Sequence, residues 1–389
     1  MKIIYKILVL FFSILSLFSF ATTTHAIVDP FLVPNNKFGV HILFPSELEE
    51  ARSLVNSSGG DWGYVTIPIQ AIDKNLEKWQ KFMSDAGKLH IIPIIRIATE
   101  NYYFDTKLWR KPIEADVLDF ANFLDSLDWP TKNRYVVIFN EVNRADEWGG
   151  EVNPREYAEI LQYAVMVFKS KNQDFFIISA GLDNASASLP KESIDEYRFM
   201  EEMNNAVPGI LSQIDALGSH SYPNPGFSQP PWITTSKSIS SFKYEKAKAW
   251  NLSNKTLPVF ITETGWSLNM VSESKMAAYY EEAFKSIWND ESIIAITPFL
   301  LKAGTPFTQF SLINSLGGKT LGYKAIDKIQ KVKGAPKLSE NNIIDSIEKD
   351  QENLLPTKNF LDDLTTEKDN LIQLKTVKTI LKWLINPKM

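Results

Sequence analysis

Short apolar runs recur along most of the chain, spaced about 25 to 45 residues apart, which is the scale of one strand plus one helix. They are rich in β-branched residues and are continuous rather than alternating. That pattern is typical of strands buried on both faces of a parallel sheet. The eight runs begin at Phe38, Trp62, Leu89, Arg134, Phe175, Ile214, Leu257 and Ile293.

Helical patterns occupy the intervals between these runs. Asn153 and Pro154, for example, provide a helix cap and a first-turn proline ahead of an apolar periodic segment. A capping-box pattern at 46–49 precedes another such segment. Helices are predicted over 51–55, 76–86, 157–168, 275–288 and 323–332.

Strands that alternate with helices predict an α/β fold with a parallel sheet. Eight such units in about 300 residues most naturally close into a (β/α)₈ TIM barrel with a single catalytic domain. An open doubly wound sheet is the alternative, but no Gly-rich phosphate loop follows the first run. In a barrel of this kind, catalytic groups lie at the C-terminal ends of the strands.

The two ends of the chain differ from this pattern. Residues 1–26 combine lysines, an apolar stretch and small polar residues, which is the layout of a cleaved secretory signal. We therefore expect a secreted or cell-surface protein, with an uncleaved membrane anchor as the alternative. The barrel is predicted over 27–335 and a charged tail over 336–389. Apolar residues at helical spacing in 371–385 predict a terminal amphipathic helix that packs on the barrel or touches an anionic membrane surface.

Composition narrows the chemistry. The 389 residues include no cysteine and four histidines, and the formal net charge is −5. The lack of cysteine excludes a disulfide scaffold, a thiol nucleophile, a thiolate metal site and a lipoprotein anchor. The acidic balance argues against nucleic-acid binding. With no Gly-x-Ser-x-Gly elbow and no His-x-His pair in the first run, we expect a monomeric hydrolase that needs neither metal nor cofactor.

Polar residues follow two of the apolar runs directly. Asn140, Glu141 and Asn143 come after the fourth run, and Glu263 follows the core of the seventh. Such groups are costly at the end of a buried strand unless they are used. Strands four and seven end across the barrel mouth from each other, and two carboxyl groups facing one pocket suit cleavage of a glycosidic bond. Two glutamates in unrelated salt bridges are the alternative.

At this point the chain resembles the clan A glycoside hydrolases, the 4/7 superfamily, over roughly 38–333. The resemblance is carried by Asn140 and Glu141 on strand four, Glu263 on strand seven and the His-Ser-Tyr string 220–222 on strand six. It implies that Glu141 is the acid/base, that Glu263 is the nucleophile and that the anomeric configuration is retained. Retention requires carboxyl groups only about 5–5.5 Å apart.

The resemblance also implies roles for neighbouring residues. Asn140 is similar to the residue that bonds the sugar 2-hydroxyl, and Tyr222 to the tyrosine that donates to the nucleophile. His220 lies two residues before Tyr222, so both side chains point the same way; a satisfied core histidine is the alternative. Arg96 near the end of the third run is a candidate to hold Glu263 ionised. Clan members place their arginine on strand two instead, so a structural ion pair is the alternative for Arg96.

Further substrate-binding candidates are less specific. They include His41 within the first run and Asn143 after the fourth. Many clan members carry a sugar-stacking tryptophan at the end of strand eight, whereas this chain has none in 298–302. Trp266, shortly after the nucleophile, is the expected partial substitute. Trp148, in a polar loop beside two glycines, is the aromatic residue that we most expect to stack on a sugar.

The sequence therefore predicts an exported retaining β-glycosidase that acts on a polysaccharide or oligosaccharide. One alternative is a catalytically weak or inactive barrel that binds glycans in cell-surface polysaccharide assembly, since the strand-two arginine is missing and strand eight is unusual. The other is a transglycosylase, which shares the first half-reaction and differs only in the acceptor. In each case the partner is a carbohydrate.

Overall fold

The computed structural model describes residues 27–100 and 108–339, so the predicted N-terminal signal and the predicted terminal helix lie outside the described residues. Each of the eight apolar runs contains a strand, as predicted. The strands are β1 (Gly39–His41), β2 (Gly63–Gln70), β3 (Ile91–Ala98), β4 (Arg134–Ile138), β5 (Phe175–Ile178), β6 (Leu217–Ser219), β7 (Val259–Ile261) and β8 (Ile293–Ile296).

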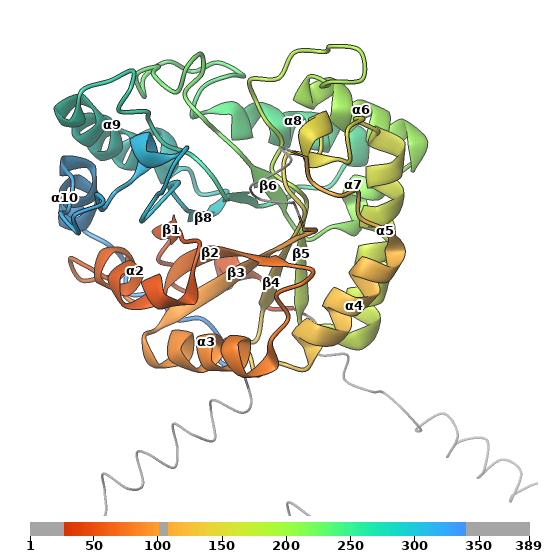
Figure 1. The fold of residues 1–389 in the computed structure, drawn as a ribbon, viewed down its shortest axis with the longest axis horizontal. Helices are drawn as coiled ribbons and strands as arrows, with labels where there is room; N and C mark the ends of the chain where they lie inside the picture. The colour runs from red at the N-terminus through yellow and green to blue at the C-terminus, as the bar shows by residue number, and fades with distance from the viewer. Residues whose placement is uncertain (1–26, 101–107, 340–389) are drawn as a thin grey trace, which may run out of the picture. The chain divides into compact units, whose positions relative to one another are not determined.

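The strands close into a parallel barrel. Strands β1 to β5 form one sheet in sequence order and β6 to β8 form a second. Isolated parallel bridges join the sheets at both seams, between Ile178 and Ala216 and between Phe38 and Ile296. Figure 1 shows the strands at the centre with the helices arranged around them. The predicted (β/α)₈ barrel is confirmed.

Helices cover the outside of the barrel. Five of them match predicted segments, and α4, α6, α7 and α8 were not predicted. The helices are α2 (Leu48–Val55), α3 (Leu76–Lys88), α4 (Glu114–Asp125), α5 (Pro154–Lys171), α6 (Glu196–Ala206), α7 (Ile210–Gln213), α8 (Ser241–Ser253), α9 (Glu273–Lys285) and α10 (Leu321–Lys328). Short 3-10 segments are η1 (Pro30–Leu32), η2 (Pro45–Glu47), η3 (Ala145–Glu147), η4 (Ile287–Asn289) and η5 (Thr308–Phe310).

Two predicted helix starts have different outcomes. The Asn153 side chain accepts a hydrogen bond from the Glu156 N–H, so the predicted cap of α5 is present. The capping box predicted at 46–49 is not. Pro45 instead opens η2, and the Glu47 carboxylate accepts from the N–H groups of Leu43 and Phe44. Helix α2 begins at Leu48, three residues before the segment predicted over 51–55.

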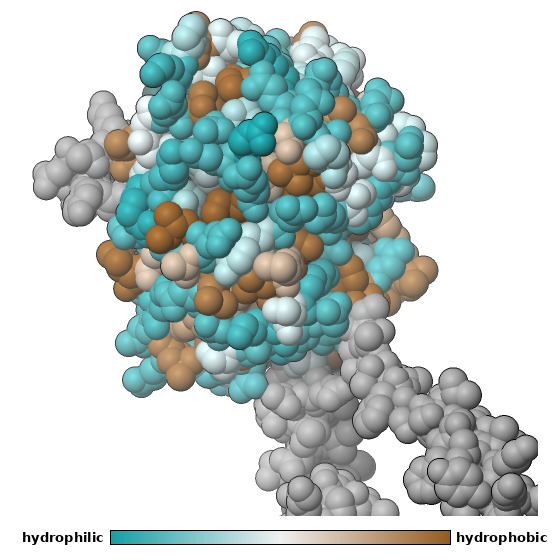
Figure 2. Space-filling model, turned by 90° about the vertical axis from the view of Figure 1, so that its right-hand side faces the viewer, coloured by the Kyte–Doolittle hydropathy of each residue, from teal (hydrophilic) through white to brown (hydrophobic). Residues whose placement is uncertain are grey.

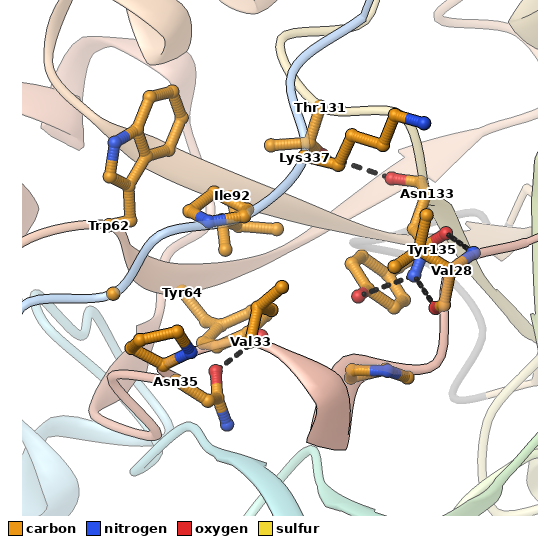
Figure 3. Close-up of a pocket in the computed structure, with 14 residues that line it drawn as sticks. Val28, Val33, Asn35, Trp62, Tyr64, Ile92, Thr131, Asn133, Tyr135 and Lys337 are labelled. Atoms are coloured by element: carbon orange, nitrogen blue, oxygen red, sulfur yellow. Dashed lines mark hydrogen bonds between the residues drawn. The ribbon is translucent and has the colours of Figure 1, made fainter.

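The end of the barrel at which the strands begin is closed by the chain ahead of β1 and the chain after α10. Figure 3 shows the polar contacts that hold this seal. The Asn133 side chain exchanges hydrogen bonds with both backbone groups of Val28 and donates to the Tyr135 hydroxyl. The Tyr64 hydroxyl donates to Asn35. These residues also line a pocket at this end. In barrels of this kind the catalytic groups lie at the opposite end, where the strands finish.

The outer surface carries no large apolar band on the side that Figure 2 displays, which includes α5 and α6. Brown apolar residues are scattered there among teal polar ones. In the described part of the chain, no helix has both the length and the apolarity needed to cross a membrane.

Candidate active site

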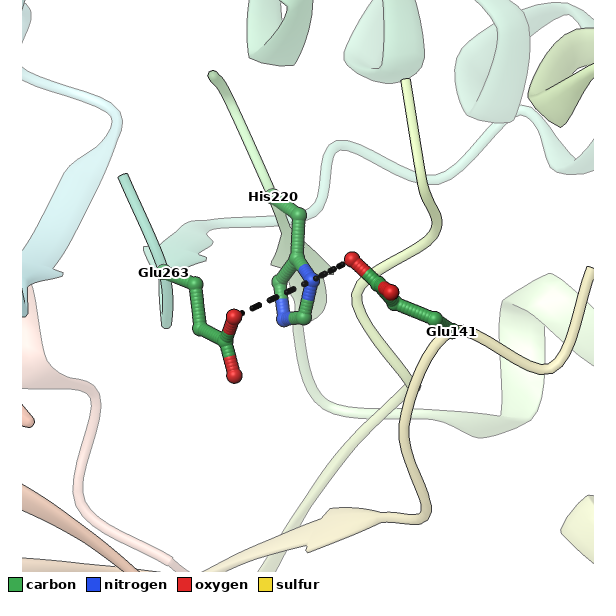
Figure 4. Close-up of side chains that lie close together, drawn as sticks. All are labelled: Glu141, His220 and Glu263. Carbon is green, nitrogen blue, oxygen red and sulfur yellow. Dashed lines mark hydrogen bonds and ion pairs between the residues drawn. The ribbon is translucent and has the colours of Figure 1, made fainter. Parts of the chain in front are cut away.

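Three side chains converge where strands β4, β6 and β7 end. Glu141 follows the last residue of β4 by three positions, His220 directly follows β6 and Glu263 follows β7 by two positions. Figure 4 shows the His220 ring between the two carboxylates. One oxygen of each glutamate and a ring nitrogen of His220 all lie within 4.8 Å of one another. The barrel thus joins two residues that are far apart in the sequence.

Glu141 is held by a strained turn. Both Phe139 and Glu141 have positive φ, 67° and 37°, which is uncommon for residues with a Cβ. The Glu141 N–H donates to the Gly181 carbonyl at 2.9 Å, and the Arg144 N–H donates to the Glu141 carbonyl at 2.9 Å. Such backbone strain persists only where surrounding contacts impose it, and it is concentrated at functional sites.

The Glu141 carboxylate has two basic partners. His220 Nδ1 lies 2.9 Å from Oε1, and Arg144 Nη1 lies 3.0 Å from Oε2. Arg144 also bonds Asp146 at 2.6 Å and lies 3.7 Å from Asp183. The sequence analysis missed Arg144. Its only signal was its place three residues after Glu141 in the same strand-end loop.

The Glu263 carboxylate is compensated by different groups. The Tyr222 hydroxyl donates to Oε2 at 3.1 Å, and Arg96 Nη1 lies 3.3 Å from Oε1. His41 Nε2 is 3.7 Å from Oε1 and His220 Nδ1 is 3.8 Å from Oε2. The carboxylate is almost fully buried, and the nearby cation and hydroxyl donor offset part of the cost of that burial. The predicted placement of Tyr222 and Arg96 beside Glu263 agrees with the structure.

The local charges separate the two histidines. Burial opposes a charged His220 ring, but the carboxylates of Glu263 and Glu141 outweigh it and raise the His220 pKa. Burial, followed by the charges of Arg96 and His220, lowers the His41 pKa well below its usual value. The site therefore shifts the pKa values of the two histidines in opposite directions, upward for His220 and downward for His41.

A glycine makes room for the catalytic centre. A Cβ built on Gly181 would lie 2.1 Å from Cδ2 of His220. Gly181 also accepts the hydrogen bond from the Glu141 N–H. This single residue, which follows β5, therefore fixes the position of both His220 and Glu141.

The two tryptophans proposed for sugar stacking do not face the cleft, and both predictions are wrong. Trp148 is fully buried, its ring packs edge-on against Phe139 and Tyr157, and its N–H donates to Glu156. Trp266 is also fully buried, and its N–H donates to the Gln229 carbonyl. Each indole fills space between a strand-end loop and the outer helices, so neither has a face free for a ligand.

Three further predicted substrate contacts need correction. Asn143 is fully buried, and its amide bonds the backbone of Asp183 and Ile194, so it joins two loops. His41 and His220 are covered as well and act on the glutamates rather than on a sugar. Of the remaining candidates, Asn140 is only half-buried, and its Oδ1 has no hydrogen-bond partner within the described residues.

The end of β8 is built around an aromatic residue that the sequence analysis had not proposed as a site residue. Phe299 packs edge-on against His41, with ring centroids 5.3 Å apart, and against Phe307 at the same distance. Phe299 lies in the segment 298–302, where clan members carry a tryptophan and this chain does not. That position was the sequence signal that could have identified it as a site residue. Phe307 is partly exposed, which leaves an aromatic surface at this edge of the mouth.

The same convergence could in principle hold a metal. Glu141, His220 and Glu263 form the one group of at least three acidic or histidine side chains with suitable spacing in the described residues. Each of them, however, is already paired: His220 with Glu141, Arg144 with Glu141 and Arg96 with Glu263. Cationic side chains thus occupy the positions from which a metal would be bound.

Comparisons with known proteins agree with this geometry at the level of the fold. No family model and no curated protein matches the chain. A family 39 glycoside hydrolase structure from Bacteroides cellulosilyticus WH2 aligns with a TM-score of 0.54 at 17% identity, covering 78% of this chain and 65% of that one. A GH39 β-xylosidase from Caulobacter crescentus aligns at 0.54 and 13% identity, covering 76% and 71%.

A third solved structure is a GH128 (subgroup II) endo-β-1,3-glucanase from Sorangium cellulosum. It aligns with a TM-score of 0.51 at 15% identity, and the alignment covers 76% of this chain and 99% of that chain. At these identities the likeness concerns the fold. The chain has the (β/α)₈-barrel fold of the clan A glycoside hydrolases, which the resemblance in its strand-end residues implied.

Proposed function

We propose that this protein is a retaining β-glycosidase that hydrolyses a polysaccharide or oligosaccharide by double displacement. The observation that carries the proposal is the placement of Glu141 and Glu263 at the barrel mouth with oxygens within 4.8 Å. Retaining glycosidases use carboxyl groups about 5–5.5 Å apart, whereas inverting ones need about 6.5–9.5 Å to admit a water molecule. The short separation favours direct attack by one carboxylate on the sugar.

In the first half-reaction, Glu263 attacks the anomeric carbon and Glu141 gives its proton to the departing glycosidic oxygen. The bond from C1 to that oxygen breaks as the bond from C1 to a Glu263 oxygen forms. Arg96 and the Tyr222 hydroxyl hold the nucleophile in place and favour its charged form. Burial, with the charges of Glu263 and Glu141, raises the Tyr222 pKa well above its usual value, so the phenol stays a donor.

In the second half-reaction, Glu141 acts as a base. It accepts a proton from a water molecule as the water oxygen attacks C1, and the bond between C1 and Glu263 breaks. His220 and Arg144 both contact the Glu141 carboxylate, so they stabilise its charged form between the two steps. The cycle ends with both glutamates in their starting states.

The test combines turnover with covalent trapping. Purified protein is incubated with a panel of aryl β-glycosides, and the anomeric configuration of the first product is followed by proton NMR. A mechanism-based epoxide probe is added separately, and the labelled residue is mapped by mass spectrometry. We expect retention of configuration and a label on Glu263.

Two variants make the result specific. Glu263→Gln should lose both turnover and labelling, whereas Glu159→Gln, which changes an exposed glutamate on α5, should keep both. An inverted product, or a label that persists in Glu263→Gln, contradicts the proposal. If wild-type protein binds glycans but neither turns over nor becomes labelled, the binding-only alternative replaces it. If oligosaccharide products longer than the substrate accumulate, the enzyme is a transglycosylase.

We further propose that the enzyme is exported and acts as a monomer. The signal-like pattern of residues 1–26 supports export. Protein recovered from the medium of a bacterial expression host should begin at Ile27, and cell-bound protein with an intact N-terminus would contradict cleavage. Light scattering should give one chain per particle. Sedimentation with anionic vesicles, with and without residues 340–389, tests a membrane contact by the tail.

A further inference from the structure

A small pocket lies beside the catalytic pair. Its lining includes Arg96 from β3, Asn140 and Glu147, and its cavity of about 20 Å³ has room for a small polar group. Arg96 is the ion-pair partner of Glu263, and Asn140 is the residue before Glu141. Two of the lining residues therefore adjoin the two glutamates.

Two buried polar groups in this pocket have no hydrogen-bond partner among the residues that the structure describes. The Asn140 Oδ1 and the Arg96 Nε are buried and make no hydrogen bond within the described residues. Glu147 lines the same pocket and is half-buried. Leaving a buried group such as Asn140 Oδ1 or Arg96 Nε unsatisfied costs about 1–3 kcal/mol, so each of these two calls for a partner that is supplied from outside.

The chemistry of these groups selects the kind of partner. Asn140 Oδ1 needs a donor, Arg96 Nε needs an acceptor, and a carboxyl group accepts up to several hydrogen bonds. A sugar hydroxyl is both a donor and an acceptor, so adjacent hydroxyls on one ring match this set. A ligand that has only donors or only acceptors cannot satisfy all of these groups.

The surrounding charge restricts the sugar further. Glu147 sits at the end of η3, among the charges of Glu141, Asp146, Arg144 and Arg96. Burial, with a smaller contribution from the Glu141 carboxylate, raises the Glu147 pKa to about 8. The burial that disfavours the charged form of Glu147 also disfavours a second anion at this position. A uronate carboxylate or a sulfate group at this position is therefore unfavourable.

We propose that Glu147 is a substrate-binding residue that accepts hydroxyl groups of the glycone and restricts that sugar to a neutral one. The inference rests on the proposed function, since it places the glycone by the nucleophile. It adds a third carboxyl group to the site, one that takes no part in bond cleavage.

The experiment measures kcat and KM at pH 6 for aryl β-glycosides of neutral sugars and for the matching uronide. Glu147→Ala should lower kcat/KM for the neutral glycone about 10- to 100-fold, since one or two hydrogen bonds are lost. The preference for the neutral sugar over the uronide should narrow in the same variant. Glu147→Gln, which resembles the protonated carboxyl group, should stay within about threefold of wild type.

A pH profile separates binding from a merely structural role. In wild type, KM for the neutral glycone should change as pH rises through about 8, when Glu147 ionises, and this change should be absent from Glu147→Gln. Glu151→Ala, an exposed residue four positions later in the same loop, is the matched control. If Glu147→Ala keeps kcat/KM within threefold for every neutral substrate, the proposal is overturned.

The role of Glu147 in binding can be tested even if the proposed hydrolase activity is absent. If wild-type protein hydrolyses none of the glycosides, calorimetric titration with neutral oligosaccharides and their uronate counterparts takes the place of kinetics. Neutral-sugar binding that is lost in Glu147→Ala but kept in Glu151→Ala then supports the pocket without any catalysis. Binding that Glu147→Ala does not weaken, or no binding by wild type, overturns it.

Discussion

Two pairs of carboxyl groups lie around strand β6, and the protein treats them in opposite ways. Glu141 and Glu263 meet at the ring of His220, the residue after β6. Glu245, on α8, accepts a hydrogen bond from Ser219, the last residue of β6, and is electrostatically coupled to Glu196 at the start of α6. All four side chains are largely removed from water, yet their surroundings differ.

The two glutamates at the barrel mouth contact cationic side chains, whereas Glu245 and Glu196 form no ion pair with any described residue. Arg144 and His220 contact Glu141, and Arg96 contacts Glu263. In contrast, Glu245 has only the hydroxyls of Ser219 and Ser241 as partners, and neither oxygen of Glu196 has a partner within the described residues. The first arrangement surrounds its carboxyl groups with positive charge, and the second leaves burial to favour the protonated form.

The pKa values of the second pair follow from this difference. Burial raises the Glu245 pKa to about 7. Burial and then the charge of Glu245 raise the Glu196 pKa well above its usual value. The comparison teaches that burial by itself makes an acid neutral, and that the mouth needs its arginines and histidine to oppose that effect.

The largest expected effect separates the pairs by function. Glu263→Gln should lower kcat by about 10⁴-fold or more, because it removes the nucleophile. Glu196→Gln should leave kcat within about threefold and raise stability at pH 8 by about 1–2 kcal/mol, because the unfavourable ionisation disappears. Kinetics and thermal unfolding of both variants check this contrast. A large loss of kcat in Glu196→Gln would show that the pairs act as one unit.

The next effect concerns the geometry of the mouth. Gly181→Ala should displace the His220 ring, which leaves no space for a Cβ, and should lower kcat on the order of 10²-fold, as misplacements of about 1 Å do. Gly304→Ala is the control, since a Cβ at Gly304 meets no atom within 4 Å. If Gly181→Ala turned over at the wild-type rate, His220 would have no positioning role.

A smaller effect is the pH dependence that the second pair gives to stability. The Glu245 pKa is about 7 in the folded protein, and an unfolded glutamate titrates near about 4.3. The folded state therefore holds the extra proton, and stability falls as pH rises from about 4.5 to about 7. We expect a loss of about 3 kcal/mol from this residue. Chemical denaturation across that range should show a flatter profile for Glu245→Gln than for Glu159→Gln.

The smallest effect tests whether the pairs are independent. They share no hydrogen-bond partner among the described residues, so the stability changes of Glu141→Gln and Glu196→Gln should add within about 0.5 kcal/mol. The double variant and both single variants, unfolded in denaturant at pH 8, provide the measurement. If the stability changes were clearly non-additive, the ionisation of the glutamates at the barrel mouth and that of Glu196 and Glu245 would be linked through the residues of β6.

Much of the fold could be predicted because it depends on local burial. The eight strands are continuous apolar runs, and such runs fit only the interior of a parallel sheet. Helix α4 was missed although Val117, Phe120, Ala121 and Leu124 have helical spacing. Helix α8 offered less, since its buried face includes Ser241 and Glu245 alongside Phe242. When the buried face of a helix is polar, the sequence lacks the periodic apolar residues by which a helix is recognised.

The site was predictable mainly where a residue lies within three positions after the end of a strand. Glu141, Glu263, His220 and Tyr222 do so, and the barrel brings them together. Trp148 stands in a polar, glycine-containing segment that looks exposed, yet the loop turns back and buries the indole completely. Local composition cannot indicate such a path, because it depends on what the loop packs against.

By itself the sequence determined where the strands run and which polar side chains stand at their ends, because both depend on the polarity of neighbouring residues. Only the tertiary structure decided which of those side chains meet. Barrel closure sets Glu263 beside Arg96 and Tyr222, and the path of the loop after β4 adds Arg144 to Glu141. The same closure leaves Glu196 without a cation. The charge state of each carboxyl group follows from those long-range contacts, since burial and neighbouring charge exist only in the folded chain.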